Sequence, residues 1–537
     1  MSSKTWTLVA AVLGSAVVFL DSSVLPVALA RIGQEPRLFL DVFEALNYVH
    51  YGYLLTLSAL LVLAGALTDY HGRRRMFGLG LVSFALTSLA CGLAPNLELL
   101  VLFRLLQGAA GALLVPASLA LLTNAFSGEE QGRAFGIWAA ASGASVILGP
   151  FVGGVLVQEV SWRAIFLLNL PFIALAIWAL RTHVAESRDP EAVRHFDWPG
   201  ALLVALAVGG LSFGAIYGEQ RQWADPLALV ALAAGALSAV ALPFYFARVR
   251  HPLVPLSMFR SRNFSVTNLS TLLIYGSLYV VFFLVPIYLQ GTLGYSAAAV
   301  GLGMIPNSLF LVFLSARFGG LASRLGPRRF MAIGPLLMGT GTLWLARMPA
   351  ESQAWQLSLG DPQTYVPGTG YLLDVLPAML VQGLGVAIMV APLTTALMRS
   401  VPGRQAGLAS AINNAISRVG PQLAGALIFV VVTMTFYAAV GQRLPGLDIT
   451  SPEVRAVIPP LAYPTAELTP HELGAVVVAS TEAFRLAMIC AAALAILGGL
   501  VNGLWISDRQ ALGAPKGSEP DLSMPRPDQP GADDATS

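Results

Sequence analysis

Apolar runs of about 20 residues, separated by short polar segments, recur along nearly the whole chain. A helix rises about 1.5 Å per residue, so each run is long enough to cross the roughly 30 Å hydrocarbon core of a bilayer. Counting the runs between clusters of charge, glycine and proline predicts about fourteen spans. We expect these to begin near Thr7, Asn47, Met76, Leu97, Arg133, Trp162, Trp198, Pro226, Phe264, Ser296, Phe330, Leu372, Ala406 and Ala479.

Composition and charge agree with a membrane protein. Of the 537 residues, 56% are hydrophobic and 11% are charged, whereas a soluble domain carries about 25% charged residues. If the N-terminus is inside, basic residues in the inner loops outnumber those in the outer loops by about three to one, as the positive-inside rule requires. We therefore expect an all-α, multi-pass protein of a bacterial cytoplasmic membrane, with both termini cytoplasmic.

The chain contains an internal repeat. The segment GALTDYHGRRR (Gly65 to Arg75) returns as GGLASRLGPRR (Gly319 to Arg329), and both fit G-x-L-x-x-x-x-G-x-R at an offset of 254 residues (319 − 65). Parallel repeats of six spans are a transporter architecture, with the substrate site near the midplane between the halves. The predicted parts are a six-helix bundle (1–181), two additional helices with linkers (182–254), a second six-helix bundle (255–506) and a disordered cytoplasmic tail (507–537).

Five motifs stand in chain order along the first half of the sequence: LDSSVLPVAL (20–29), GALTDYHGRRR (65–75), RLLQGAAGA (104–112), LGPFVGGVL (148–156) and WRAIFLLNLP (162–171). They resemble motifs of the major facilitator superfamily, in its fourteen-span drug:proton antiporter branch. The resemblance implies the major facilitator fold, here two six-helix bundles plus two additional central spans, and alternating access driven by the proton gradient without a cofactor.

The sequence departs from the family pattern at informative places. Ser323 stands in the second-half loop where the first half has Asp69, and Tyr48 stands where the family commonly has tryptophan. Spans ten and thirteen lack the acids that some multidrug members carry there, which argues against polycationic substrates. The expected cargo is an amphipathic organic compound, cationic or neutral.

Asp21 interrupts the first apolar run, in VVFLDSSVLPVAL. A charge near the bilayer centre costs about 2.5 to 3.5 kcal/mol, and such residues usually face a cavity, pair with another charge or relay protons. Asp21 is expected roughly 9 Å, and Arg104 about 10 Å, below the outer edge of the hydrocarbon core. We predict that they form a proton-coupling pair, because a carboxylate binds its proton more tightly when desolvated than beside a guanidinium. A carboxylate bound to nearby backbone and a purely structural ion pair remain as alternatives.

Polar and small residues on the same helix faces are candidates for the substrate cavity. Arg104, Gln107, Gly108 and Gly111 follow the i, i+3, i+4, i+7 spacing of one helix face, where small residues permit close approach. Three residues of span thirteen fall at i, i+4, i+8, and three more polar residues lie in other spans. The candidates are Gln107, Gly111, Tyr275, Gln290, Asn307, Asn414, Arg418 and Gln422.

Two glycine-containing segments are candidates for conformational gating. The resemblance implies that the loop after span two latches the two halves in the outward-facing state. The alternative is that the arginines of this loop only anchor the topology, and we favour it for Arg74 and Arg75. In span five, proline and glycine together give a bend and a close helix contact, although ordinary packing of a glycine-rich helix is the alternative. The gating candidates are Gly65, Asp69, Gly72, Arg73, Gly149, Pro150, Gly153 and Gly154.

These features predict a proton-coupled secondary transporter that exports amphipathic organic compounds. The sequence leaves open a different cargo, namely a lipid, a siderophore or a metabolite. An intramembrane enzyme would need a cluster of histidine, serine or acidic residues, or a metal set, at membrane depth, so no enzymatic activity is predicted. The expected partners are a small-molecule substrate, protons and membrane lipids, without nucleic acid or metal. The protein is expected to work as a monomer, and an accessory periplasmic partner is left open.

Overall fold

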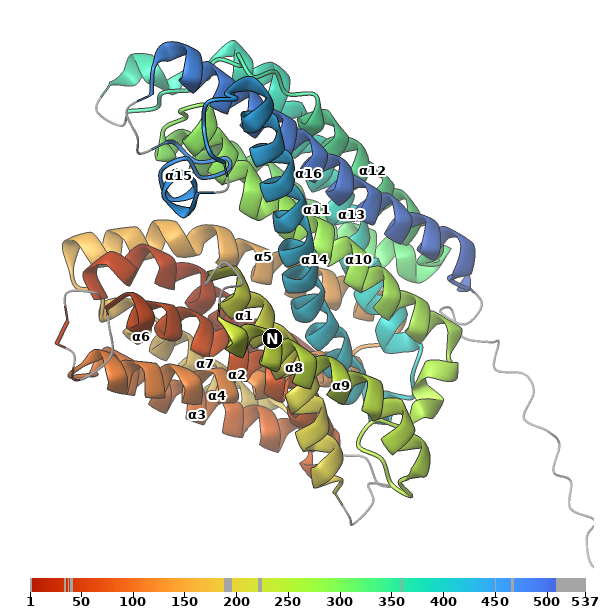
Figure 1. The fold of residues 1–537 in the computed structure, drawn as a ribbon. Coiled ribbons are helices and arrows are strands. Elements are labelled where there is room, and N and C mark those ends of the chain that lie inside the picture. Colours follow the sequence, from red (N-terminus) through yellow and green to blue (C-terminus); the bar gives the residue numbers. More distant parts are fainter. Residues whose placement is uncertain are drawn as a thin grey trace, which may run out of the picture.

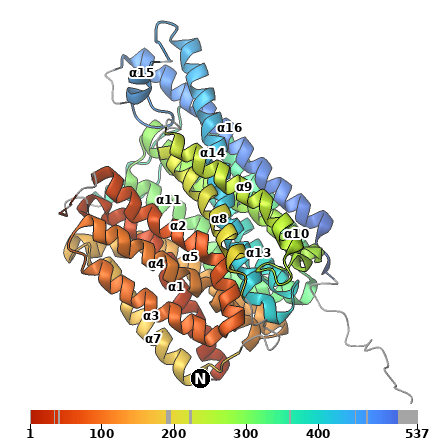
Figure 2. The same cartoon turned by 60° about the horizontal axis from the view of Figure 1, so that its bottom comes forward.

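The computed structural model describes residues 2–32, 35–36, 38, 42–187, 196–220, 225–358, 361–449, 451–464 and 468–508. These residues form two helical bundles and an additional pair of helices beside them (Figures 1 and 2). From residue 509 onward, the tail that was expected to be disordered lies outside the described residues.

The first bundle and the additional pair come first in the chain. The bundle contains α1 (Ser3–Ile32), α2 (Val42–His71), α3 (Arg73–Gly92), α4 (Leu97–Ala125), α5 (Gly128–Glu159), α6 (Ala164–Leu167) and α7 (Asn169–His183), and the pair is α8 (Trp198–Gln220) and α9 (Pro226–Arg248). The short α6 and the longer α7 together form one span.

The second bundle follows the additional pair. It contains α10 (Arg262–Ile287), α11 (Ala297–Leu325), α12 (Arg328–Ala346), α13 (Leu376–Arg399), α14 (Ala406–Arg443), α15 (Pro452–Val457) and α16 (Pro470–Trp505). Short π-helical turns, η2 (Tyr288–Thr292) and η4 (Tyr371–Val375), extend α10 and precede α13, and short 3₁₀ turns are η1 (Leu256–Arg260), η3 (Pro362–Tyr365) and η5 (Gly403–Gln405).

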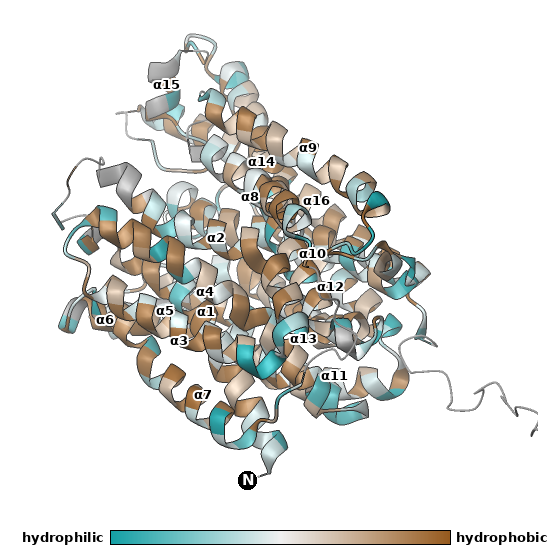
Figure 3. Cartoon of the chain, turned by 90° about the horizontal axis from the view of Figure 1, so that it is seen from below, coloured by the Kyte–Doolittle hydropathy of each residue, from teal (hydrophilic) through white to brown (hydrophobic). Residues whose placement is uncertain are grey.

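Within the described part of the chain, thirteen helices are long and apolar enough to cross a membrane. The predicted span that begins near Phe330 is not among these thirteen. It corresponds to α12, which has 19 residues and packs along α13 and α16. Figure 3 shows hydrophobic positions along most of the helices and hydrophilic ones mainly at their ends. The chain is therefore a multi-pass membrane protein with the predicted fourteen-helix architecture.

The largest difference from the expected helix starts is at α16, which begins nine residues before Ala479. Thr469 and Glu472 form a capping box: the Glu472 carboxylate accepts from the Thr469 backbone N–H at 2.8 Å, and the Thr469 hydroxyl accepts from the Glu472 N–H at 3.4 Å. Pro470 occupies the first helical position, where its missing N–H costs nothing. The helix thus starts in a polar segment that hydropathy alone assigns to a loop.

The additional pair is joined to both bundles. α8 packs on α9 and also on α2 and α14. Its start is fixed by Asp197, whose carboxylate accepts from the Gly200 N–H at 2.8 Å, the Tyr245 hydroxyl at 2.8 Å and the Leu253 N–H at 2.9 Å. One buried side chain therefore ties α8, α9 and the segment before α10 together. Elsewhere the bundles meet where α2 packs along α14 and α5 along α11.

Candidate functional site

Asp21 of α1 and Arg104 of α4 form an ion pair inside the first bundle. Arg104 donates from Nη1 to Asp21 Oδ2 at 2.5 Å. Arg104 is fully buried, and 4% of Asp21 is exposed. The structure thus brings together the two charges that were expected at one depth. Because neither charge reaches water, removing one would leave the other buried and uncompensated.

Two amides and a hydroxyl complete the surroundings of Asp21. Gln107 of α4 and Asn169 of α7 donate to Asp21 Oδ1 at 3.1 and 3.2 Å. Both amides also donate to the Ser88 hydroxyl of α3, at 2.8 and 3.1 Å, and Gln107 Oε1 accepts from Arg104 Nη1 at 2.7 Å. Residues of α1, α3, α4 and α7 thus converge on one carboxylate and supply donors that suit its ionised, acceptor-only form.

Aromatic rings cover the Arg104 guanidinium. Its central carbon lies 4.2 Å from the centre of the Tyr53 ring and 5.6 Å from that of Phe166, distances at which an aromatic face attracts a cation. Arg104 Nε donates to the Val49 carbonyl at 3.0 Å. Among the described residues, Nη2 of Arg104 is buried without a hydrogen-bond partner. The guanidinium therefore keeps one unused donor next to Asp21.

Small residues let α4 approach α2 at this level. A Cβ at Gly108 would overlap the Tyr53 carbonyl oxygen, and one at Gly111 would lie 3.3 Å from Leu57 Cδ1. Gly111, predicted to line a substrate cavity, therefore lies in the packing between helices of the first bundle. Gln107, predicted for the same cavity, lies in the hydrogen-bond network of Asp21.

Asp69 of α2 connects the two bundles at the end of the molecule where the chain begins. Its buried carboxylate accepts from the backbone N–H groups of Gly407 at 3.2 Å and Leu408 at 2.8 Å. These amides belong to the first turn of α14, have no partner within the helix and favour a negative charge. We call this end of the molecule, defined by residues 65–75 and 403–408, the latch end.

Arg73 and Gly65 add to the contact made by Asp69. Arg73 donates from Nη2 to the Gly403 carbonyl at 2.5 Å, and its Nε lies 3.6 Å from Asp69 Oδ1. A Cβ at Gly65 would overlap the Cβ of Ala411, so glycine is needed for α2 to touch α14 here. The candidates Gly65, Asp69 and Arg73 therefore lie directly in the contact between the bundles.

The internal repeat places a second contact at the latch end, between α11 and α5. Gly319 and Ser323, which correspond to Gly65 and Asp69, pack against Gly132. The Ser323 hydroxyl donates to the Gly319 carbonyl of its own helix at 3.0 Å. In the contact between α2 and α14, the Asp69 carboxylate thus joins the two bundles by hydrogen bonds. In the contact between α11 and α5, the Ser323 hydroxyl bonds within its own helix and only packs against Gly132.

The hydrogen bonds and ion pairs that the structure describes between residues 2–187 and 255–508 all lie at the latch end. Apart from those of Asp69 and Arg73, they are Arg324 with Glu129, Arg399 with the Gly128 carbonyl and Arg399 with Gln131. Further along α5, Phe151 is 72% exposed, and a Cβ at Gly154 would meet no atom within 4 Å. The two bundles are therefore held together at the latch end.

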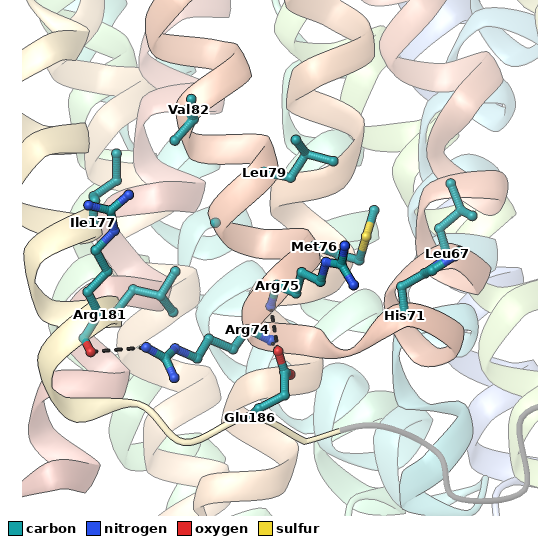
Figure 4. A pocket seen from close by; sticks show the side chains of 12 residues that line it. Leu67, His71, Arg74, Arg75, Met76, Leu79, Val82, Ile177, Arg181 and Glu186 are labelled. Carbon is teal, nitrogen blue, oxygen red and sulfur yellow. Dashed lines mark hydrogen bonds between the residues drawn. The ribbon is translucent and has the colours of Figure 1, made fainter.

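Glu186, in the segment after α7, stabilises the start of α3. Gly72 precedes this helix with a φ of 104°, in the left-handed region that favours glycine. The Glu186 carboxylate accepts from the N–H of Arg74 at 3.0 Å and of Arg75 at 2.9 Å. Figure 4 shows these groups at the lower edge of a pocket of about 800 Å³, with apolar side chains above them. Glu186 thus caps the start of α3, and the described hydrogen bonds of Arg74 and Arg75 stay within the first bundle.

Ion pairing at the opposite end fixes the connection after α1. Arg163 donates to both carboxylate oxygens of Glu35, each at 2.8 Å, and Trp162 donates to Oε1 at 2.9 Å. The hydrogen bonds from Arg163 lower the pKa of Glu35 below its usual value, against the opposing effect of partial burial. This pair therefore joins the segment after α1 to the connection between α5 and α6.

The glycines of α5 differ in their contacts with α1. A Cβ at Gly149 would overlap the Ser23 hydroxyl oxygen, and one at Gly153 would lie 2.7 Å from Val24 Cγ1. A Cβ at Gly154 would meet nothing within 4 Å. Gly149 and Gly153 therefore permit the close approach of α5 to the helix that carries the buried carboxylate, and Gly154 does not take part.

We expect Gly149→Ala to slow transport at least severalfold and to lower the melting temperature, while Gly154→Ala has little effect. Forcing a methyl group into a close helix contact costs about 1 to 3 kcal/mol, and only the first position has such a contact. The measurement is dye efflux from cells together with thermal unfolding of both purified variants. Equal effects of the two substitutions would contradict the assigned contact.

The other cavity candidates lie in the second bundle. Asn307 is buried and donates its amide to Gln382 Oε1 at 2.8 Å, so it links α11 to α13. Tyr275 is partly buried in α10, and Gln290 is exposed in η2. The polar stripe of α14 contains Asn414, Arg418 and Gln422. Of the gating candidates, Pro150 lies within α5, and its side chain is outside the described part of the structure.

Several residues that complete the site are not singled out by the sequence pattern. Ser88 and Asn169 are ordinary polar residues of apolar runs until folding brings α3 and α7 to Asp21. Asn169 does stand in the motif WRAIFLLNLP, which is a usable signal. The partners of the latch have a signal too, because the spacing of Gly403 and Gly407 repeats that of Gly128 and Gly132 at an offset of 275 residues (403 − 128).

Comparison with known proteins agrees with the fold. Residues 11–425 match the Major Facilitator Superfamily. The chain belongs to this family of transporters. The family predicted from the motifs is therefore confirmed.

Relatives within the superfamily include named resistance proteins. Multidrug resistance protein Stp of Mycobacterium tuberculosis (strain CDC 1551 / Oshkosh) is 32% identical over 423 residues, covering 79% of this chain and 74% of Stp. The tetracenomycin C resistance and export protein of Streptomyces glaucescens is 31% identical over 434 residues, covering 80% and 77%. Puromycin resistance protein pur8 of Streptomyces alboniger is 34% identical over 443 residues, covering 80% and 82%.

A solved structure shows the same fold. The human organic anion transporter MFSD10 superposes with a TM-score of 0.56 at 15% identity, covering 93% of this chain and 99% of that one. At this identity, the similarity concerns the fold alone.

Proposed function

We propose that this protein is a secondary transporter that exports amphipathic organic compounds, including drugs, across a bacterial cytoplasmic membrane in exchange for protons. The relatives named for multidrug, tetracenomycin C and puromycin resistance support drug export. The observation that carries proton coupling is the buried Asp21–Arg104 pair with its surrounding donors. The transporter works as a monomer and needs small-molecule substrate and protons, without a cofactor.

Protonation of Asp21 provides the coupling step. The ionised carboxylate accepts hydrogen bonds from Arg104, Gln107 and Asn169. A proton on Asp21 removes the charge that Arg104 needs and turns one acceptor into a donor. The packing of α1 against α3, α4 and α7 that suits the ionised form is then no longer favoured. If one conformation favours ionised Asp21 and the other favours protonated Asp21, binding of the proton shifts the equilibrium between the two conformations.

The latch end is the cytoplasmic side in this proposal, since the distribution of basic residues places both termini inside. The closed latch then corresponds to the outward-facing state, which Gly65, Asp69, Gly72 and Arg73 stabilise. Opening of the latch exposes the substrate path to the cytoplasm. Substrate binding from the cytoplasm and proton uptake from outside would alternate between these two states.

The test is an efflux assay in bacterial cells that lack their main drug exporters. Cells that express the protein are expected to accumulate several times less of an amphipathic dye than matched cells that express Asp21→Asn. A protonophore should abolish this difference while cellular ATP is maintained. Equal accumulation with and without the wild-type protein, across cationic, neutral and anionic dyes, would contradict drug export. Efflux that survives the protonophore would contradict proton coupling.

A further inference from the structure

Arg418 is a charged residue within α14 that has no ion pair or hydrogen bond with any residue that the structure describes. Two other arginines within spans do have partners. Arg104 forms an ion pair with Asp21, and Arg485 of α16 donates to the Ala346 carbonyl at 3.1 Å. Arg418 is also only partly buried. A guanidinium at membrane depth is costly without a counter-charge, and residues of this kind usually mark substrate or ion pathways.

Helix geometry places Arg418 on the face of α14 that meets the first bundle. Ala411 lies on that face, because a Cβ at Gly65 of α2 would overlap it. Arg418 follows seven residues later, which is two helical turns and about 10 Å along the same face. It therefore lies beyond the latch contact, toward the middle of the membrane and between the two bundles.

Tyr53 of α2 connects this position to the buried ion pair. Arg418 is close enough to Tyr53 for an electrostatic interaction between the two side chains. The Tyr53 ring is fully buried and lies against Arg104, and its hydroxyl donates to the Val18 carbonyl at 3.1 Å. A ligand bound to Arg418 would therefore be within electrostatic reach of Tyr53, the residue whose ring covers Arg104.

The described carboxylates around α14 are all engaged elsewhere. The helix itself contains no acidic residue between Ala406 and Arg443. On the helices that pack against it, acidic side chains within the described part of the structure bind other groups. These are Asp69 with the N–H groups of Gly407 and Leu408, Glu98 with the Leu38 N–H, Glu472 with Thr469, and Glu482 with Arg443. None of these contacts neutralises Arg418.

We propose that Arg418 binds an anionic group, a carboxylate or an ionised phenol, of the exported compound. The inference rests on the proposed export function and names a substrate class for it. A guanidinium presents a planar set of donors that matches a carboxylate, and charge-assisted bonds of this kind are strong. Gln422, one turn beyond Arg418, has a buried side-chain oxygen without a described partner, which suits a hydroxyl of the same ligand. This class differs from the cationic or neutral cargo expected from the sequence.

The test compares an anionic and a cationic dye on the full-length protein in lipid nanodiscs. The wild type is expected to bind carboxyfluorescein, and Arg418→Gln should raise the Kd for this dye at least about tenfold. Arg418→Lys keeps the charge but loses the planar set of donors, and it should restore part of the affinity. Ethidium should bind more tightly to Arg418→Gln, since a repelling charge is removed. Arg329→Gln, an exposed position at the start of α12, serves as the matched control and should not change either Kd.

Two outcomes separate this inference from the proposed function. An unchanged Kd for carboxyfluorescein in Arg418→Gln, or a wild type that binds and exports ethidium but not carboxyfluorescein, would overturn the role of Arg418 and leave drug export standing. Failure of the wild type to export anionic, neutral and cationic dyes alike would contradict export itself. If the glutamine variant does not fold, Arg418→Met provides the same comparison without the charge.

Discussion

Purified Asp21→Asn protein is expected to release no protons when a substrate binds, whereas the wild type releases them. Asparagine keeps the shape of the side chain but cannot titrate, and Asp21 is the carboxylate at the centre of the buried network. Uphill efflux driven by a pH gradient should fall to background, while a neutral substrate still binds. The measurement is the pH change of a weakly buffered protein solution on addition of substrate.

The control for this prediction removes the partner charge as well. Asp21→Asn leaves Arg104 buried without its counter-ion, which costs about 3 to 5 kcal/mol in comparable buried pairs. The double variant Asp21→Asn, Arg104→Gln lacks both charges and should therefore be more stable than the single variant, yet equally uncoupled. Proton release at the wild-type level from either folded variant would show that Asp21 is not the coupling residue.

Asp69→Asn is expected to slow transport about tenfold, and Ser323→Ala less than twofold. Asp69 is a buried anion at the N-terminus of α14, an interaction worth up to about 2 kcal/mol in favourable geometries. Each 1.4 kcal/mol corresponds to about tenfold in an equilibrium constant, so the latch should open much more often. Ser323 bonds only within its own helix, and its loss leaves the contact between the bundles in place.

A distance measured between the two halves at the latch end tests whether Asp69→Asn opens the latch. Spin labels at exposed positions of each half, such as Arg75 and Arg329, should report a longer mean distance in Asp69→Asn than in the wild type. The Ser323→Ala protein should keep the wild-type distribution. Equal and mild effects of both substitutions on transport and distance would remove the role assigned to Asp69.

The sequence by itself determined the features that depend on the helix as a local unit. The rise per residue and the length of an apolar run are nearly the same in every membrane helix, so the spans, the repeat and the shared depth of Asp21 and Arg104 could be read without a structure. The start of α16 could not be read from hydropathy because a capping box, and not an apolar residue, begins that helix.

The tertiary structure alone decided which way each helix face points. The rotation of a helix about its own axis is set by packing against its neighbours. Sequence spacing therefore placed Gln107 and Gly111 on one face of α4 but could not show what that face contacts. In the structure it meets α1, α2 and α3 and not a substrate path. The same packing brings Asn169 to Asp21 from a distant span. It also leaves Arg418 unpaired between the bundles, because Asp69, a carboxylate that does reach that face of α14, binds the N–H groups of Gly407 and Leu408 about three turns away.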